Sequence, residues 1–144
     1  MDSRTIRILL VDGSNPFLDS FTNWLDGRPD VIVVGTAATG RDAIEAAGLL
    51  RPDLVVMDVV LPILDGFRAA QAIKARPDPP CVLLVTLHPS RTAEDAAIAA
   101  GADGLLSKAD LAETFDGTLV NLGLLRLERE PCPIRRAAED EVPL

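Results

Sequence analysis

The sequence predicts an α/β protein in which five parallel strands form one sheet that is covered by helices on both faces. Five short apolar runs are separated by segments of helical periodicity, and the runs do not alternate polar with apolar residues. Strands that are covered on both faces have this composition, which favours a parallel sheet with right-handed crossovers. A chain of 144 residues is long enough to bury a core without disulfides.

The predicted strands are short and rich in Val, Ile and Leu. They cover residues 6–11, 31–34, 54–57, 82–85 and 104–107, and the last of them is the least apolar. Runs of this length favour strands, because helices in globular proteins usually need about 10 residues or more.

Apolar residues recur at helical spacing between these runs. Three helix faces are evident: Phe17, Leu18, Phe21, Trp24 and Leu25; then Ala43, Ile44, Ala47 and Leu50; then Phe67, Ala70 and Ile73. Ser14 followed by Pro16 predicts the start of the first helix. Thr39 with Asp42 resembles a capping box and predicts the start of the second. Alternation of strand and helix through the chain gives the (βα)5 arrangement.

Composition and charge exclude several classes of protein. The 22 acidic residues outnumber the 14 Lys and Arg and give a net charge of −8, which argues against a basic nucleic-acid-binding face. No apolar run approaches the ~18–20 residues of a membrane span, and the first residues lack the apolar segment of a secretory signal. Cys81 and Cys132 form no CxxC motif, and His88 is the one histidine. We therefore expect a cytoplasmic protein with reduced thiols and no nucleic-acid or membrane partner.

A polar residue follows four of the five apolar runs. Asp12, Asp58, Thr86 and Lys108 each stand where a strand is expected to end. Sites in open parallel sheets form at the carboxyl ends of the strands, so these side chains are expected to share one edge. A carboxylate can act as a nucleophile toward phosphorus, and a second can help to hold Mg²⁺. Taken singly, each residue fits an ordinary loop or surface role equally well.

Longer motifs around these residues resemble the receiver domain of bacterial two-component response regulators, which is CheY-like. Asp58 is followed by Pro62 and then by Asp65 and Gly66, which is the D-x-x-x-P-x-x-D-G spacing of that family. The stretches 51–58 (RPDLVVMD), 38–43 (ATGRDA) and 101–104 (GADG), the last leading to Lys108, resemble further family signatures in the family's order. The resemblance covers about residues 5–126.

The resemblance implies a flavodoxin-like, doubly wound sheet of strand order 2-1-3-4-5 and a role for each residue at its edge. Asp58 would be the phosphoacceptor for a histidine kinase or phosphotransfer protein, and Thr86 and Lys108 would bind the phosphoryl group. Asp12, Asp58 and the Val60 carbonyl would hold Mg²⁺. A receiver domain is expected over residues 4–128, with a flexible tail over residues 129–144. The tail is too short for a helix-turn-helix, so DNA binding by this chain is not expected.

Four positions depart from the family pattern: a mild change, Ala109 where a Pro often follows the lysine, and three that touch the phosphorylation machinery. Gly13 stands where most members have a second acidic residue, so Mg²⁺ binding is expected to be weakened. Leu87 replaces the usual small residue after Thr86 and is expected to narrow access to Asp58. Leu105 replaces the switch aromatic, and the sequence has no tyrosine. Two alternatives thus stay open: a working receiver, or an atypical receiver that acts without phosphorylation as an interaction or dimerisation module.

The leucines near the end of the predicted domain suggest an interface. Six apolar residues would spread around the last helix, over more of its surface than one core-facing stripe: Leu119, Val120, Leu122, Leu124, Leu125 and Leu127. Gly123 within this stretch weakens the helix prediction. In the family that the chain resembles, helix 4, strand 5 and helix 5 often form a dimer surface, so we expect a homodimer through this face. A more remote alternative is a Mg²⁺-dependent phosphohydrolase, but Val60 stands where that class needs a second Asp. We therefore do not expect an enzyme.

Overall fold

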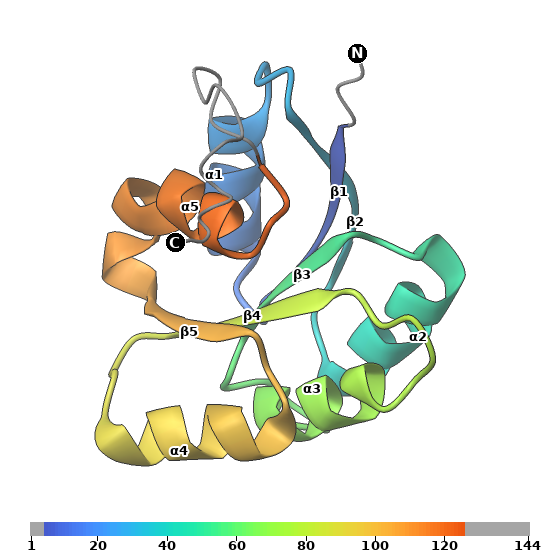
Figure 1. Ribbon diagram of the computed structural model, residues 1–144, viewed down its shortest axis with the longest axis vertical. Coiled ribbons are helices and arrows are strands. Elements are labelled where there is room, and N and C mark those ends of the chain that lie inside the picture. The colour runs from blue at the N-terminus through green and yellow to red at the C-terminus, as the bar shows by residue number, and fades with distance from the viewer. Residues whose placement is uncertain (1–4, 126–144) are drawn as a thin grey trace, which may run out of the picture.

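The computed structural model describes residues 5–125 of the chain. These residues form one five-stranded parallel sheet of order β2-β1-β3-β4-β5, which confirms the predicted class and strand order (Figure 1). The strands are β1 (Ile6–Val11), β2 (Val31–Ala37), β3 (Leu54–Asp58), β4 (Cys81–Thr86) and β5 (Gly104–Ser107).

Helices cover both faces of the sheet. On one face lie α1 (Asn15–Leu25) and α5 (Leu111–Asn121), and on the other lie α2 (Gly40–Leu50), α3 (Gly66–Lys74) and α4 (Arg91–Ala100) (Figure 1). A single 3-10 turn, Lys108–Asp110, joins β5 to α5. Within residues 5–125, no helix is long and apolar enough to cross a membrane.

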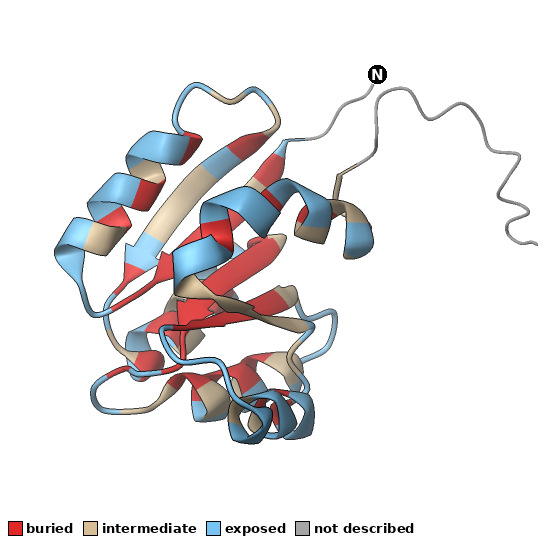
Figure 2. Cartoon of the chain, turned by 90° about the vertical axis from the view of Figure 1, so that its left-hand side faces the viewer, coloured by how far each residue is buried: buried red, intermediate tan, exposed pale blue. Residues whose placement is uncertain are grey.

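Each face of the sheet has its own buried core. Val55 and Met57 of β3 pack in the cluster under α2, α3 and α4, whereas Leu54 and Val56 pack in the cluster under α1 and α5. All five residues of β3 are buried, and the central strands β1, β3 and β4 are the most continuously buried elements in Figure 2. Burial on both sides explains why the apolar runs in the sequence do not alternate with polar residues.

The first two helices begin where the sequence predicts. The Ser14 side chain caps α1 by accepting a hydrogen bond from the Phe17 N–H (3.3 Å), and Pro16 lies in the first turn. The Thr39 hydroxyl caps α2 by accepting from the Asp42 N–H (3.0 Å). These caps fix both helix starts just beyond the carboxyl ends of β1 and β2.

The second strand is longer than predicted. It continues past residue 34 to Ala37, with a bulge where Ile8 pairs with Val33 and Leu9 pairs with Gly35. β2 is an edge strand, and its burial varies along its length. The fully apolar signal therefore ends before the strand does.

The prediction that the last helix continues through the leucines to residue 127 is wrong. The helix α5 ends at Asn121, and Gly123 adopts a left-handed φ of 79° that turns the chain. Leu119 is fully buried, and Leu122, Leu124 and Leu125 pack against the α1–α5 core of the same molecule. These leucines therefore give no exposed apolar stripe for a dimer. Leu127 and the predicted tail over residues 129–144 lie outside the described residues.

Candidate functional site

Two carboxylates end at the same level on neighbouring central strands. Val11 pairs with Met57 across β1 and β3. Asp12 and Asp58 are the next residues of the two chain segments, so they lie side by side at the carboxyl edge of the sheet. Both side chains are nearly buried, with 2% of Asp12 and 12% of Asp58 exposed. Two acids at this depth need compensation, because an unpaired buried charge is costly.

The compensation comes from Lys108, at the end of β5. Its ammonium Nζ lies 2.6 Å from Asp12 Oδ2 and donates a hydrogen bond of 3.0 Å to Asp58 Oδ2. The lysine side chain is 11% exposed, so solvent screens these ion pairs only weakly. The sequence prediction that the three residues share one edge is therefore met by direct contact.

Backbone amides orient the other oxygen of each carboxylate. Asp12 Oδ1 accepts from the Ser14 N–H (2.8 Å), and Asp58 Oδ1 accepts from the Val60 N–H (3.1 Å). Each carboxylate thus has Oδ1 held by its own loop and Oδ2 turned to the ammonium. This fixes both acids without any further side chain.

Burial and charge act in opposite directions on these groups. Burial raises the pKa of the Asp12 carboxyl, and the neighbouring Lys108 ammonium does not fully reverse this. Burial by itself lowers the pKa of Lys108, but its contacts with Asp12 and Asp58 outweigh burial and raise it. The lysine therefore stays charged at neutral pH and holds the pair together.

Thr86 reaches the same edge from β4. The strand register pairs Asp58 with Val85, so Thr86 lies one residue beyond the acid on the adjacent strand. Its side chain is buried, and its hydroxyl accepts a hydrogen bond from the His88 N–H (3.2 Å). The hydroxyl proton of Thr86 remains available to an acceptor placed at this edge.

The loop after Asp58 requires a glycine at position 66. A Cβ there would lie 2.3 Å from the Asp58 carbonyl oxygen and 2.7 Å from Val59 Cα, closer than side chains tolerate. The Gly66 N–H donates to the Val59 carbonyl (2.9 Å), and Asp65 caps α3 by accepting from the Arg68 N–H (2.9 Å). The Asp-Gly pair therefore brings the start of α3 against the site.

The carboxylate oxygens at this edge are the type of ligand that a hard divalent cation prefers, but only two carboxylates are present. Asp12 Oδ2 is buried and receives no well-aligned hydrogen bond, so its charge is met by the Lys108 ammonium alone. Within residues 5–125, no cluster of three or more acidic, His or Cys side chains is suited to a metal ion. Position 13 is an exposed glycine, so the edge has two carboxylates where a third could stand.

The other two atypical positions differ in burial. Leu87 is 64% exposed, which places most of its side chain in solvent at the rim of the edge. Leu105 pairs with Leu84 in the β4–β5 register and packs partly buried against the α2–α4 core. Leu105 therefore contributes apolar packing at this position but no aromatic ring.

Sequence reasoning missed one contact at the site. The ring of Phe17 lies under the Lys108 ammonium, with Nζ 4.3 Å from the ring centroid. In the sequence, Phe17 reads only as one of the apolar residues on a helix face. Its place beside Ser14, which binds Asp12, was the one signal that could have suggested proximity to the site.

The fold and the acid–lysine cluster at this edge fit one known class of protein, and a comparison with known families identifies it. A family described as "Response regulator receiver domain" matches residues 8–115. This chain belongs to the response regulator receiver domain family.

Relatives with curated names are longer proteins. The chain is 36% identical over 104 residues to a protein-glutamate methylesterase/protein-glutamine glutaminase of Pseudomonas syringae pv. syringae, covering 72% of this chain and 27% of that protein. It is 44% identical over 70 residues to a protein of the same description from Nocardioides sp., covering 49% and 19%. The chain thus spans about a quarter of the length of these relatives, and their esterase names describe those proteins.

Solved structures show the same fold. The signal receiver domain of the putative response regulator NarL from Mycobacterium tuberculosis matches with a TM-score of 0.78 and 26% identity, over 85% of this chain and 99% of that one. The response regulator domain of Thermotoga maritima CheB matches with a TM-score of 0.72 and 28% identity, over 83% and 95%. The chain is therefore a receiver of phosphorelay signalling by family and by fold.

Proposed function

We propose that Asp58 is the phosphoacceptor of this receiver and that a histidine kinase or phosphotransfer protein is the donor in the cytoplasm. The observation that carries the proposal is the Lys108 ammonium, held 3.0 Å from Asp58 Oδ2 in a nearly buried setting. A cation fixed at the acceptor oxygen offsets charge as the phosphoryl group arrives.

In the proposed step, an Asp58 carboxylate oxygen forms a bond to phosphorus while the donor's bond to phosphorus breaks. The imidazole of the donor histidine, or acetate from acetyl phosphate, leaves with the bonding electrons. The product is an acyl phosphate. Lys108 would then lie beside the transferred group, and Thr86, one residue beyond Asp58 on the adjacent strand, would donate its hydroxyl proton to one of the phosphoryl oxygens.

We further propose that Mg²⁺ assists this site and is bound weakly. Asp12, Asp58 and the Val60 carbonyl would hold it, and when bound it would neutralise phosphoryl charge. The weakness follows from Gly13, because fewer carboxylates offset less of the cost of dehydrating the ion. Lys108 also competes for the same two carboxylates.

Intact-mass analysis tests the acceptor. After incubation with acetyl phosphate and Mg²⁺, the protein should gain one phosphoryl mass, and Asp58→Asn should gain none. Asp65→Asn is the matched control, since asparagine also caps helices and the loop keeps its fold. Leu87→Ala should raise the initial rate if the leucine at the rim narrows access. A phosphoryl group that persists on Asp58→Asn contradicts the assignment.

The second candidate is a phosphorylation-independent interaction module, and Leu105 together with Gly13 favours it. A switch needs contacts that differ between its two states, and Leu105 has neither ring nor hydroxyl to exchange. A homodimer through α4, β5 and α5 stays part of this candidate, now without support from the leucines after α5. Ile98 on α4 is 75% exposed and is the apolar side chain such a face could use. Sedimentation velocity with and without beryllofluoride separates the two candidates.

We propose no catalytic turnover for this chain. The phosphohydrolase alternative needs an acid two residues after Asp58, and that residue is Val60, 76% exposed. Release of product from a generic aryl phosphate, absent in Asp58→Asn, would revive it.

A further inference from the structure

An aromatic ring packs against the ammonium of the site lysine. The Phe17 centroid is 4.3 Å from Lys108 Nζ, while the same ammonium reaches Asp12 Oδ2 at 2.6 Å. Phe17 is half-buried at the start of α1. A ring face in this position attracts a cation, and more strongly when water is partly excluded. The Lys108 ammonium therefore contacts both carboxylates and an aromatic ring.

Phe17 begins a continuous stack of rings. It stacks on Phe21 with centroids 5.8 Å apart and an interplanar angle of 12°, and Phe21 stacks on Trp24 at 5.5 Å and 15°. The spacing of four and then three residues places the three rings on one face of α1. The stack thus runs from the site along α1 to Trp24, which is 40% exposed.

The stack also contacts α5. Phe115 meets Phe21 edge-to-face at 5.5 Å and Trp24 at 5.8 Å. The Arg28 guanidinium lies over both Trp24 (5.3 Å) and Phe115 (5.8 Å), and it pairs with Asp116 of α5 at 2.6 Å. Figure 1 shows α1 and α5 side by side on this face of the sheet. A shift of Phe17 therefore has close-packed neighbours on both helices to act on.

We propose that Phe17 is a positioning residue for Lys108, and that its ring stack couples the position of the lysine to the α1–α5 face. Four of the five aromatic residues in the sequence belong to this stack. The fifth, Phe67, packs against the opposite core. Leu105 offers no ring on the β5 side, so the α1–α5 side is where a move of Lys108 meets aromatic contacts. The response to phosphorylation rests on the proposed function, whereas the coupling between the two residues does not.

A double-mutant cycle tests the coupling without any ligand. Trp24 is the single tryptophan, so its emission reports on the far end of the stack. Lys108→Met removes the charge and keeps an unbranched chain, and Lys108→Gln serves if the first variant folds poorly. We expect either change to alter the Trp24 emission in the wild-type background. The alteration should be lost in Phe17→Leu and restored in Phe17→Tyr, which keeps the ring.

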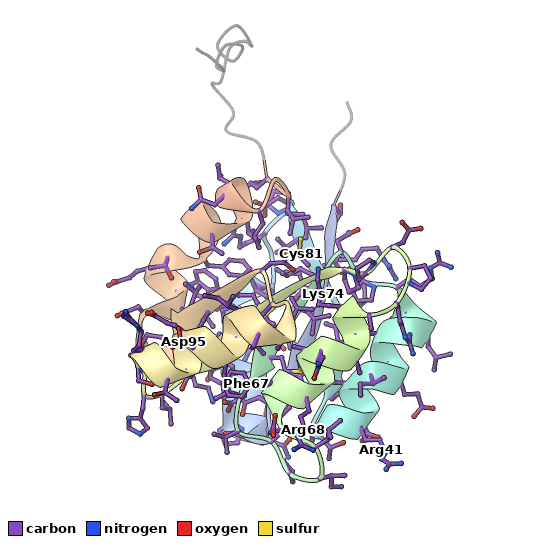
Figure 3. All side chains as sticks on the ribbon, turned by 60° about the horizontal axis from the view of Figure 1, so that its bottom comes forward. Arg41, Phe67, Arg68, Lys74, Cys81 and Asp95 are labelled. Atoms are coloured by element: carbon purple, nitrogen blue, oxygen red, sulfur yellow. The ribbon has the colours of Figure 1, made fainter. Side chains whose placement is uncertain are left out.

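Phe67→Leu is the matched control, because it removes a ring from α3 on the other face (Figure 3). The Lys108 effect on Trp24 should persist in this background. An effect of equal size in wild type and Phe17→Leu, or no effect in wild type, overturns the proposal.

Beryllofluoride with excess Mg²⁺ then separates this inference from the proposed function. Fluorine NMR reports binding at Asp58, and Trp24 emission reports the response. We expect Phe17→Leu to raise the half-saturating concentration about five-fold, the scale of one lost cation–π contact, and to abolish the Trp24 response. Bound beryllofluoride with an unchanged Trp24 response in Phe17→Leu refutes the coupling. Absence of bound beryllofluoride refutes the phosphoacceptor assignment and leaves the ligand-free cycle to decide the coupling.

Discussion

Restoring an acid at position 13 should strengthen Mg²⁺ binding. The structure has room for it, because a Cβ on Gly13 would lie 3.6 Å from Pro62 Cδ and 3.9 Å from the Ala38 carbonyl oxygen, both ordinary contacts. Gly13 is also not among the glycines with a positive φ in the described chain, so an aspartate meets no backbone strain there. Gly13→Asp therefore tests charge without first disturbing the fold.

The magnitude follows from competing charges at the edge. Two unit charges about 4 Å apart interact by about 4 kcal/mol at an effective dielectric constant of 20, and a divalent ion doubles the attraction. Dehydration of the new carboxylate and its repulsion from Asp12 and Asp58 return most of this gain. A net benefit of roughly 1.4–2.8 kcal/mol remains, which corresponds to about 10- to 100-fold in affinity.

Titration calorimetry with MgCl₂ measures the affinity directly, and Trp24 emission gives a second reading. Gly13→Asn is the control, since it adds an oxygen of similar placement without charge and should improve affinity far less. In the absence of Mg²⁺, Gly13→Asp should be less stable than the parent by about 1 kcal/mol through like-charge repulsion, and Mg²⁺ should reverse this. Equal Mg²⁺ affinities for the parent and Gly13→Asp would refute the reasoning.

Three further predictions concern stability and reactivity. Ile63 has a φ of 72° and is 74% exposed, so Ile63→Asn should stabilise the fold by about 1 kcal/mol in urea unfolding; a loss of stability contradicts the strain. Gly66→Ala should destabilise by about 1–3 kcal/mol, whereas Gly117→Ala on α5, with nothing within 4 Å, should stabilise slightly. Burial raises the pKa of the Cys81 thiol, so in a Cys132→Ser background iodoacetamide should react slowly at pH 8 and faster as pH rises; a fast rate at pH 8 contradicts this.

Buried strands were the most predictable part of the fold. The run ending in Val11 matches β1 to the residue, and Asp58 extends the third run by one position. Central strands bury both faces, so composition alone marks them. The sequence predicts the edge strand β2 only as far as residue 34, because Gly35 and Thr36 continue the hydrogen-bond ladder but not the run of apolar residues.

The end of α5 could not be read from leucine spacing. Helical periodicity treats Leu122 and Leu124 as residues on a cylinder, but the left-handed turn at Gly123 folds them back onto the core. The Leu124 N–H donates to the Leu119 carbonyl (2.9 Å), which closes the turn. Gly123 was visible as a weak point in the sequence. The direction of the chain after it depends on tertiary packing that spacing does not encode.

The site residues were predictable in kind but not in arrangement. Strand ends and family motifs placed Asp12, Asp58 and Lys108 at one edge, because parallel strands bring their carboxyl ends together. They could not show that one ammonium serves both acids, since this depends on the path of a four-carbon side chain. The place of Phe17 under that ammonium is beyond sequence reasoning for the same reason.

The ammonium that Asp12 and Asp58 share decides how the absence of an acid at Gly13 affects the charge of the site. Two carboxylates and one ammonium leave the edge with a formal charge of about −1, so Lys108 compensates half of the acidic charge of the unmodified site without a metal ion. Phosphorylation of Asp58 would replace one negative charge by about two and leave Lys108 to offset both the phosphoryl group and Asp12. The lysine has to move or divide its contacts, and Phe17 is the ring it rests on. Under the proposed function, phosphorylation would therefore act first on the position of Lys108, which contacts both acids.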